Sequence, residues 1–227
     1  MKIFTVSDLH LPGTMDKTMD MFGAKWEGHF EKIKEDWLKK VTDEDIVLIA
    51  GDISWAMHLN QAIPDLHAIG ELPGKKILIR GNHDFWWSSV SRVREALPEN
   101  MFVLQNDAIK IGDYVFAGTR GWMESNTEED KKIFAREQIR LELTLTAAQK
   151  LMDENSTLIM MLHYPPVINK VKFNQFVPKM EEFNVKYCVY GHLHGVNKLE
   201  AEIIERNNIT YILSSCDMID FSLREVK

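Results

Sequence analysis

The stretch KILIRGNHD, residues 76–84, decides how this chain folds. Its first part, Lys76 to Ile79, is short and apolar, which is typical of a strand buried on both faces. The next residues change at once to Arg80 and then to Gly81-Asn82-His83-Asp84, side chains that bind metals or move protons. A buried strand that ends in such residues indicates a sheet with a ligand site along its edge.

The same pattern occurs four more times. Asp8 and His10 follow a predicted strand at Ile3 to Val6, Gly51-Asp52 follows Asp45 to Ala50, His163 follows Thr157 to Leu162, and Gly191-His192-Leu193-His194-Gly195 follows Lys186 to Tyr190. The loops after parallel strands share one edge of a sheet. We therefore expect three aspartates, five histidines and one asparagine to meet at a single place.

Local spacing supports this convergence. The glycines that precede Asp52, Asn82 and His192 fit sharp turns off a strand, because glycine tolerates positive φ. Asp-x-His and His-x-His in extended chain direct alternate side chains to the same side. Each pair is therefore predicted to reach one centre.

Helical stretches separate the strands. Trp26 to Lys40 and Ala56 to Gly70 lie between the first three strands, which predicts a βαβαβ unit with parallel strands. A long helix is expected from Glu128 to Met152. Its buried face is predicted to carry Leu141, Leu145, Ala148 and Met152. The segment Leu11 to Lys25 has no clear period and is expected to be a loop beside the site.

Further strands are predicted in the centre and the tail. The central ones are Phe102 to Leu104, Ile109 to Ile111 and Tyr114 to Ala117, and the tail is expected to form antiparallel strands at Glu200 to Glu205, Thr210 to Leu213 and Ile219 to Arg224. Two mixed sheets packed together and flanked by helices use all these elements. The fold class is therefore α/β with mixed sheets of the α+β kind.

Composition describes an ordinary globular chain. At 227 residues, with 45% apolar and 27% charged residues, a single domain over 1–227 is expected. The formal charge of −7 disfavours a nucleic-acid surface but allows a small anionic substrate, since bound cations invert the local field. Two cysteines give no disulfide framework. No signal peptide or membrane span is apparent, so a cytoplasmic protein without a membrane partner is expected.

The clustered carboxylates need compensation. Left bare, they would repel one another, and two divalent cations would resolve that repulsion. Carboxylates and neutral imidazoles suit Mn, Fe, Zn or Ni. A carboxylate from the middle strand can bridge two such metals about 3.5–4 Å apart.

In their order and spacing, the five motifs from Asp8 to His194 resemble the calcineurin-like metallophosphoesterase superfamily. The resemblance implies a four-layer αββα sandwich. The second motif continues as Gly51-Asp52-Ile53-Ser54-Trp55-Ala56, without the Asp-Arg-Gly that the serine/threonine protein phosphatases of this superfamily carry. The chain is therefore more similar to the small bacterial members.

The resemblance also implies roles for the residues. The first metal would be held by Asp8, His10 and His194, the second by Asn82, His163 and His192, and Asp52 would bridge them. His83 would donate a proton to the leaving group or act as an electrophile on the phosphate, and Asp84 would orient it. A metal-bridged hydroxide would attack the phosphorus of a phosphomonoester or phosphodiester.

Four further residues are candidates for contact with a small phosphorylated substrate. They are Arg80, Arg120, Tyr164 and Trp86, each of which also has an ordinary structural explanation in an ion pair, a surface loop or the core. Two alternatives stay open for the function. One is a nuclease of the same superfamily, which the acidic charge disfavours, and the other is a non-catalytic scaffold, which the complete set of ligands and His83 disfavours.

Overall fold

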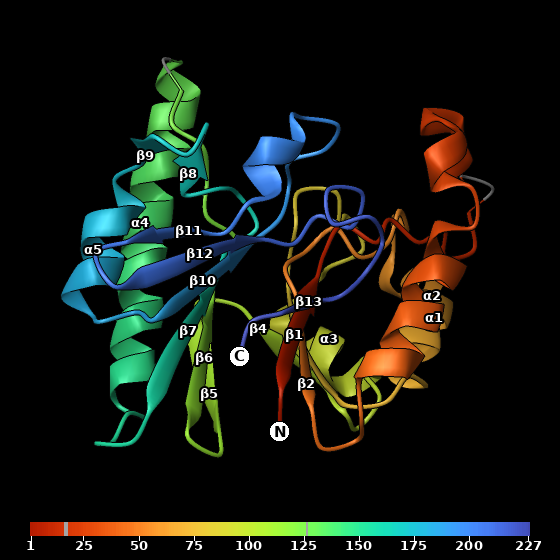
Figure 1. The fold of residues 1–227 in the computed structure, drawn as a ribbon, viewed down its shortest axis with the longest axis horizontal. Helices are drawn as coiled ribbons and strands as arrows, with labels where there is room; N and C mark the ends of the chain where they lie inside the picture. Colours follow the sequence, from red (N-terminus) through yellow and green to blue (C-terminus); the bar gives the residue numbers. More distant parts are fainter. Residues whose placement is uncertain (16–17, 126) are drawn as a thin grey trace.

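The computed structural model describes residues 1–15, 18–125 and 127–227, which form two large sheets flanked by helices (Figure 1). The first sheet has the order β13-β1-β2-β3-β4. Its strands are β1 (Ile3–Val6), β2 (Ile46–Ile49), β3 (Lys75–Ile79), β4 (Met101–Leu104) and β13 (Arg224–Glu225). The strands β1 to β4 are parallel, and β13 is antiparallel to β1 at the edge.

The second sheet has the order β11-β12-β10-β7-β6-β5. Its strands are β5 (Asp107–Ile111), β6 (Tyr114–Gly118), β7 (Thr157–Met161), β10 (Tyr187–Tyr190), β11 (Ile204–Arg206) and β12 (Ile209–Leu213). The four inner strands are parallel and the two edge strands are antiparallel. A small hairpin joins β8 (Val167–Ile168) and β9 (Lys172–Phe173). The predicted pair of mixed sheets is confirmed.

Three apolar clusters separate four layers. One lies between the first sheet and the helices α1 (His29–Lys40), α2 (Leu59–Gly70) and α3 (Val90–Ala96). Another lies between the second sheet and the helices α4 (Glu128–Gln149) and α5 (Phe176–Glu182). The third fills the space between the two sheets. The helices therefore cover the outer faces only, as the αββα arrangement requires (Figure 1).

Alternate side chains of each buried strand belong to two different apolar clusters. Val47 and Ile49 of β2 pack against the helices, whereas Ile46 and Leu48 pack against the second sheet. Successive side chains of a strand point to opposite faces, so a strand between two apolar layers must be apolar throughout. This explains why the strands that carry the motifs read as unbroken apolar runs.

The structure corrects the prediction for the tail. Residues 200–205 were expected to be a strand, but Lys198–Ala201 is a 3-10 helix and β11 covers only Ile204–Arg206. Residues 219–221 lie in a turn, in which Asp220 and Phe221 have positive φ, and only Arg224 of this stretch belongs to a strand. Only β12 matches its predicted range closely. It pairs antiparallel with β11, as expected, and parallel with β10.

Several helices also differ from the predicted elements. Neither α3 nor α5 was predicted, and 3-10 helices at Met19–Phe22 and Ala24–Trp26 interrupt the segment expected to be a loop. The part of that prediction that falls on residues 16 and 17 lies outside the described residues. On α4 the buried face also includes Phe134 and Glu137. None of the described helices is long and apolar enough to span a membrane.

Close packing between the sheets predicts the effect of one substitution. A Cβ atom on Gly118 of β6 would lie 2.6 Å from Cγ2 of Ile79 and 2.8 Å from Cβ of Leu104. We expect Gly118→Ala to lower the free energy of unfolding by about 1–3 kcal/mol because the strand must move away from its neighbours. Urea denaturation measures this change.

A double-mutant cycle identifies the clash as the cause. Ile79→Ala removes the nearest contact, so the double variant should lose less stability than the sum of the two single variants. Strict additivity would contradict the proposed clash.

Candidate metal centre

The five motifs lie where the ends of strands from both sheets meet. The strands β1, β2 and β3 of the first sheet deliver three of the motifs, and β7 and β10 of the second sheet deliver the other two. The sheets are joined at this edge, because the backbone N–H of Ser7 donates to the carbonyl of Ser214 at 2.7 Å. In addition, Nδ1 of His163 lies 2.9 Å from the carbonyl oxygen of Ala50. The site thus spans two sheets and not the edge of one.

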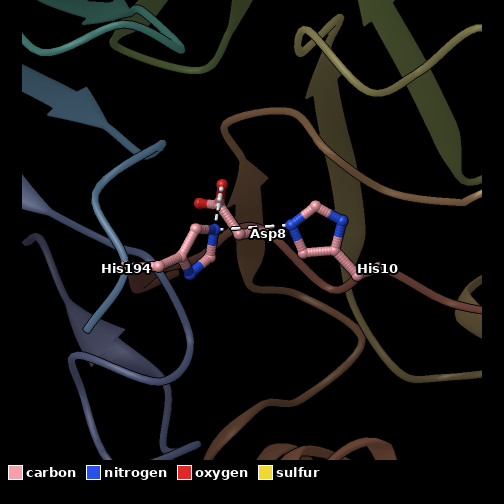
Figure 2. Close-up of side chains that lie close together, drawn as sticks. All are labelled: Asp8, His10 and His194. Carbon is pink, nitrogen blue, oxygen red and sulfur yellow. Dashed lines mark hydrogen bonds and ion pairs between the residues drawn. The ribbon is translucent and has the colours of Figure 1, made fainter. Parts of the chain in front are cut away.

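One group of donors consists of Asp8, His10 and His194 (Figure 2). The Nε2 atoms of His10 and His194 are 3.4 Å apart, and Nε2 of His194 is 3.2 Å from Oδ1 of Asp8. These three donor atoms lie within 4.8 Å of one another, which is close enough for one metal ion to contact all three.

A second group consists of Asn82, His163 and His192. Oδ1 of Asn82 lies 2.6 Å from Nε2 of His163 and 2.9 Å from Nδ1 of His192. An amide oxygen and two imidazole nitrogens therefore face one another, and each carries a lone pair that can bind a cation.

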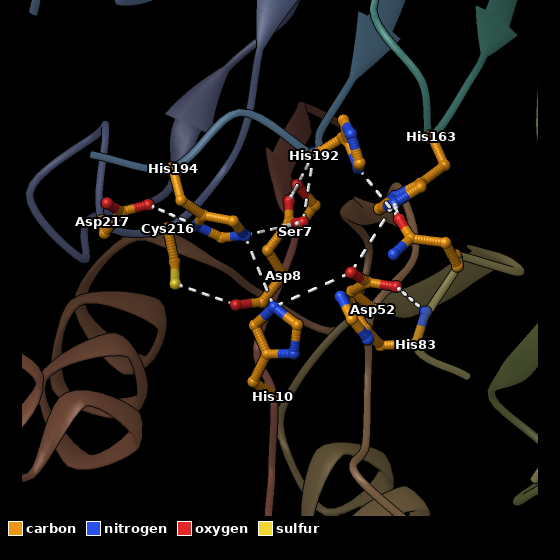
Figure 3. Close-up of polar contacts among 12 residues, drawn as sticks. Ser7, Asp8, His10, Asp52, His83, His163, His192, His194, Cys216 and Asp217 are labelled. Atoms are coloured by element: carbon orange, nitrogen blue, oxygen red, sulfur yellow. Dashed lines mark hydrogen bonds and ion pairs between the residues drawn. The ribbon is translucent and has the colours of Figure 1, made fainter. Parts of the chain in front are cut away.

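Asp52 lies between the two groups (Figure 3). Its Oδ2 is 3.7 Å from Nε2 of His10 and 3.6 Å from Nε2 of His163. Asp8, Asp52 and His163 also form a group whose donor atoms lie within 4.8 Å of one another. A single carboxylate thus faces both groups of donors.

The protonation of two of the histidines fits a metal site. Burial lowers the pKa of His10 to about 3 and that of His192 to about 4. Both imidazoles are therefore neutral at pH 7, which is the form that binds metal ions. Burial acts in the same direction on His194, but Asp8 and the hydrogen bond to Asp217 outweigh it and raise its pKa.

Burial and neighbouring charges shift the pKa values of the clustered carboxylates. Burial raises the pKa of Asp52 to about 7, His163 opposes that effect, and the carboxylates of Asp8 and Asp84 add to it. Burial also acts to raise the pKa of Asp8, but His194 outweighs it and holds that pKa well below its usual range. A bound cation would offset the repulsion between these groups, so the donor set fits a divalent metal.

The chain belongs to the calcineurin-like phosphoesterase family. The family model for calcineurin-like phosphoesterases matches residues 1–196, which contain all the donors described above. No curated protein matches this chain in sequence.

Two solved structures are similar to it. A protein of unknown function from Aquifex aeolicus has 16% sequence identity and a TM-score of 0.53, over 99% of this chain and 95% of the other. A protein from Thermus thermophilus has 12% identity and a TM-score of 0.62, over 98% and 96% of the two chains. At these identities the likeness concerns the fold alone.

The backbone at this phosphoesterase centre departs from the expected extended chain. Asp8, His10, Asp52 and His192 have φ values of 57°, 46°, 53° and 74°. Residues other than glycine rarely adopt this left-handed region, and each costs of order 1–3 kcal/mol. The alternation argument for Asp-x-His is therefore wrong, because turns and not extended chain bring Asp8 and His10 together.

The glycines of the motifs serve two purposes. Gly51 has φ of 93°, as the turn argument predicted. Gly81 and Gly191 do not have positive φ. A Cβ on Gly81 would collide with Asp52, and a Cβ on Gly191 would collide with Asp8 and Ser7. These two glycines are needed because the carboxylates approach their backbone closely.

Asp84 has a different set of partners from the expected one. Its carboxylate accepts hydrogen bonds from the backbone N–H groups of Asp52, Ile53, Ser54 and Gly81 and from the indole of Trp86, at 2.8–3.2 Å. The side chain is fully buried. These contacts make it an anchor between the loops after β2 and β3, and the expected role of orienting His83 stays a prediction.

The candidate substrate residues separate into different environments. Trp86 is 1% exposed and packs in the helix-side core of the first sheet, so a substrate contact is not supported. Tyr164 is 8% exposed, and its ring centroid lies 4.4 Å from that of His192. Arg80 and Arg120 line a cavity of their own. Burial, followed by the charge of Arg120, lowers the pKa of Arg80.

His83 faces a cavity of about 410 Å³ at the candidate centre. Its backbone N–H donates to Oδ1 of Asp52 at 2.8 Å, and its ring centroid is 4.9 Å from that of Trp55. Trp55 in turn stacks on His10 at 4.6 Å. Apolar side chains, among them Met19, Phe22 and Trp26, complete the wall. The segment of unclear period thus borders the site, as expected.

The sequence analysis did not identify Asp217, which lies behind the ligands (Figure 3). Its Oδ1 is 2.7 Å from Nδ1 of His194, and its Oδ2 accepts hydrogen bonds from Lys25 and from the backbone of Gly195. A signal existed, because Asp217 follows the predicted strand at Thr210 to Leu213 by four residues. It lacked the motif context of the other five strand ends.

The contact between Asp217 and His194 yields a prediction. The carboxylate holds Nδ1–H of His194 and leaves Nε2 for a cation. We expect Asp217→Ala to weaken Mn binding by about 10–100-fold, which is the usual cost of losing such a supporting contact. Calorimetric titration of the metal-free protein measures the affinity.

Asp220→Ala is the matched control, because Asp220 lies three residues away and is exposed, and its ion pair is with Lys198, also on the surface. Equal Mn affinity in the two variants would contradict a supporting role for Asp217.

Proposed function

We propose that this phosphoesterase hydrolyses a small phosphorylated substrate at a centre of two divalent cations, drawn from Mn, Fe, Zn or Ni. The observation that carries the proposal is the position of the Asp52 carboxylate, 3.7 Å from one group of donors and 3.6 Å from the other. Membership of the family supports metal-dependent phosphoester chemistry in general. Neutral imidazoles, carboxylates and an amide oxygen are suitable ligands for these metals.

The proposal assigns the donors as follows. One cation takes Asp8, His10 and His194, the other takes Asn82, His163 and His192, and Asp52 bridges them. When bound, such cations activate a water nucleophile and neutralise charge on the phosphoryl oxygens. The buried side chains and the strained turns keep the donors in place before any cation binds, which lowers the cost of assembling the centre.

His83 is proposed to act on the leaving group. Its main chain is held by Asp52, and its ring lines the cavity next to the donors. A histidine there can protonate the leaving oxygen as the ester bond breaks.

The cavity also suggests the chemistry of the leaving group. Its walls include the rings of Phe22, Trp26 and Trp55 and the exposed ammonium group of Lys25. Aromatic rings at the site of hydrolysis favour a leaving group with a flat or apolar portion.

The two alternatives are weaker. A nuclease would need a basic surface, whereas the chain carries a net charge of −7. A non-catalytic scaffold would be expected to lack a ligand or the catalytic histidine, whereas this chain carries the complete set of proposed ligands and His83.

Hydrolysis assays distinguish these functions. They use Mn and a panel of aryl phosphate monoesters and diesters, cyclic nucleotides, dinucleotides and nucleic acids. Metal binding without any hydrolysis would favour the scaffold.

Metal content tests the bridging role. Protein saturated with Mn is expected to hold two equivalents, measured by elemental analysis after removal of free metal. Asp52→Asn should reduce occupancy at both positions and nearly abolish activity, because it weakens a ligand that both share. His10→Ala should affect mainly one position. A limit of one equivalent in the unmodified protein, or full metal content in Asp52→Asn, would contradict the dinuclear assignment.

His83→Ala tests proton donation. We expect both metals to be retained and turnover to fall by about 10²–10⁴-fold, the usual contribution of general acid catalysis. The loss should be smaller for a nitrophenyl ester than for an alkyl ester, because a good leaving group needs little protonation.

His67→Ala provides the control, since His67 is an exposed histidine on α2. An equal loss for both esters would indicate electrostatic stabilisation instead of proton donation, and loss of metal would make His83 a ligand.

A further inference from the structure

A second cavity lies beside the candidate centre, and its walls are basic. Its volume is about 250 Å³. The charged side chains that line it are Arg80, Arg120, Arg136, Arg140 and Glu137. Arg136 and Arg140 are one turn apart on α4 and therefore share a helix face. Arg80 and Arg120 come from the ends of β3 and β6.

The charges in this cavity do not balance. Glu137 is fully buried and pairs with Arg140 at 2.6 Å, and Arg120 is 3.9 Å from the same carboxylate. It is the only carboxylate among the described residues that line the cavity. Within the described parts of the chain, neither Arg80 nor Arg136 forms an ion pair. Four guanidinium groups therefore share one negative charge.

Arg80 also carries an unsatisfied donor. Its Nε is buried and has no hydrogen-bond partner among the described residues. A buried donor without a partner costs about 1–3 kcal/mol, and more when the group is charged. An anion in the cavity would accept this hydrogen bond and offset the repulsion among the arginines. The guanidinium fork suits the oxygens of phosphate in particular.

The cavity is tied to the donors of the candidate centre. Arg80 precedes Asn82 by two residues, and the carbonyl of Arg120 accepts the backbone N–H groups of His163 and Tyr164 at 3.0 and 3.1 Å. Arg80 thus lies on the loop that carries Asn82, and the loop that carries Arg120 is hydrogen-bonded to the loop that carries His163. An anion held here would therefore border the loops of two proposed ligands.

We propose that this cavity, named the arginine pocket, binds a second phosphate group of the substrate, one that is not hydrolysed. The inference rests on the proposed function for the identity of that substrate, but the binding of phosphate does not depend on it. The pocket is smaller than typical ligand cavities of about 300–1,000 Å³, so it takes a phosphate group and not a whole nucleotide. The substrate class is a small compound with two phosphate groups.

The first experiment uses metal-free protein and inorganic phosphate, followed by calorimetry. Arg80→Gln and Arg136→Gln are the test variants, because neither residue pairs with a carboxylate that would be left unpaired. Each should raise the Kd for phosphate at least tenfold. Arg92→Gln, an exposed arginine on α3, removes the same charge elsewhere and should leave the Kd unchanged. Thermal unfolding verifies that all variants fold.

Two results would overturn the arginine pocket as an anion site. One is the absence of phosphate binding to the metal-free protein. The other is a Kd in Arg80→Gln and Arg136→Gln that equals the Kd in Arg92→Gln.

The second experiment uses the Mn-loaded protein with an aryl bisphosphate and the matching aryl monophosphate. In Arg136→Gln the KM should rise at least tenfold for the bisphosphate and stay unchanged for the monophosphate. Equal changes in KM would refute the pocket as a substrate subsite. If neither ester nor any aryl phosphate were hydrolysed, the proposed function would fail, while phosphate binding to the metal-free protein would still decide the anion site.

Discussion

Both oxygens of the Asp84 carboxylate accept hydrogen bonds from backbone N–H groups of two neighbouring loops. This buried acceptor satisfies amides that would otherwise be unpaired in the core, and it fixes the loop after β2 against the loop after β3. Asp52 and Asn82 lie on these loops, so their separation depends on Asp84. On the core side, the indole N–H of Trp86 donates a further hydrogen bond to the Asp84 carboxylate. This contact therefore holds in place the backbones that carry Asp52 and Asn82.

Assembling the candidate centre costs free energy, and the stability of the surrounding fold offsets that cost. Donors such as Asp8 and His192 occupy left-handed backbone conformations, and the carboxylates are buried close together. The apolar layers on both sides of each sheet supply the stability against which such strain is held. Divalent cations would relieve the electrostatic part of the cost. The same reasoning applies to the arginine pocket with the opposite sign, because there the excess charge is positive and an anion relieves it.

Much of the fold was predictable from local pattern. The apolar runs that became β1, β2, β3, β7 and β10 were recognised because a strand between two apolar layers has no polar face. The tail was less predictable, since the positive φ of Asp220 and Phe221 replaces a strand with a turn that no glycine marks. The short helices α3 and α5 were missed because seven residues give too little period to recognise.

By itself the sequence determined the chemistry of the candidate site, because reactive residues placed directly after buried strands must lie at a sheet edge. The apolar runs also indicated two mixed sheets flanked by helices, and the resemblance of the motifs implied the αββα class. The tertiary structure alone decided that two sheets contribute to one site and that Asp217 supports His194. It also made Asp84 a backbone anchor and buried Trp86. Finally, it placed Arg80 and Arg136 in the same cavity. The reason is physical: these contacts join segments far apart in the chain, and their partners are chosen by packing and hydrogen-bond satisfaction, which local spacing does not encode.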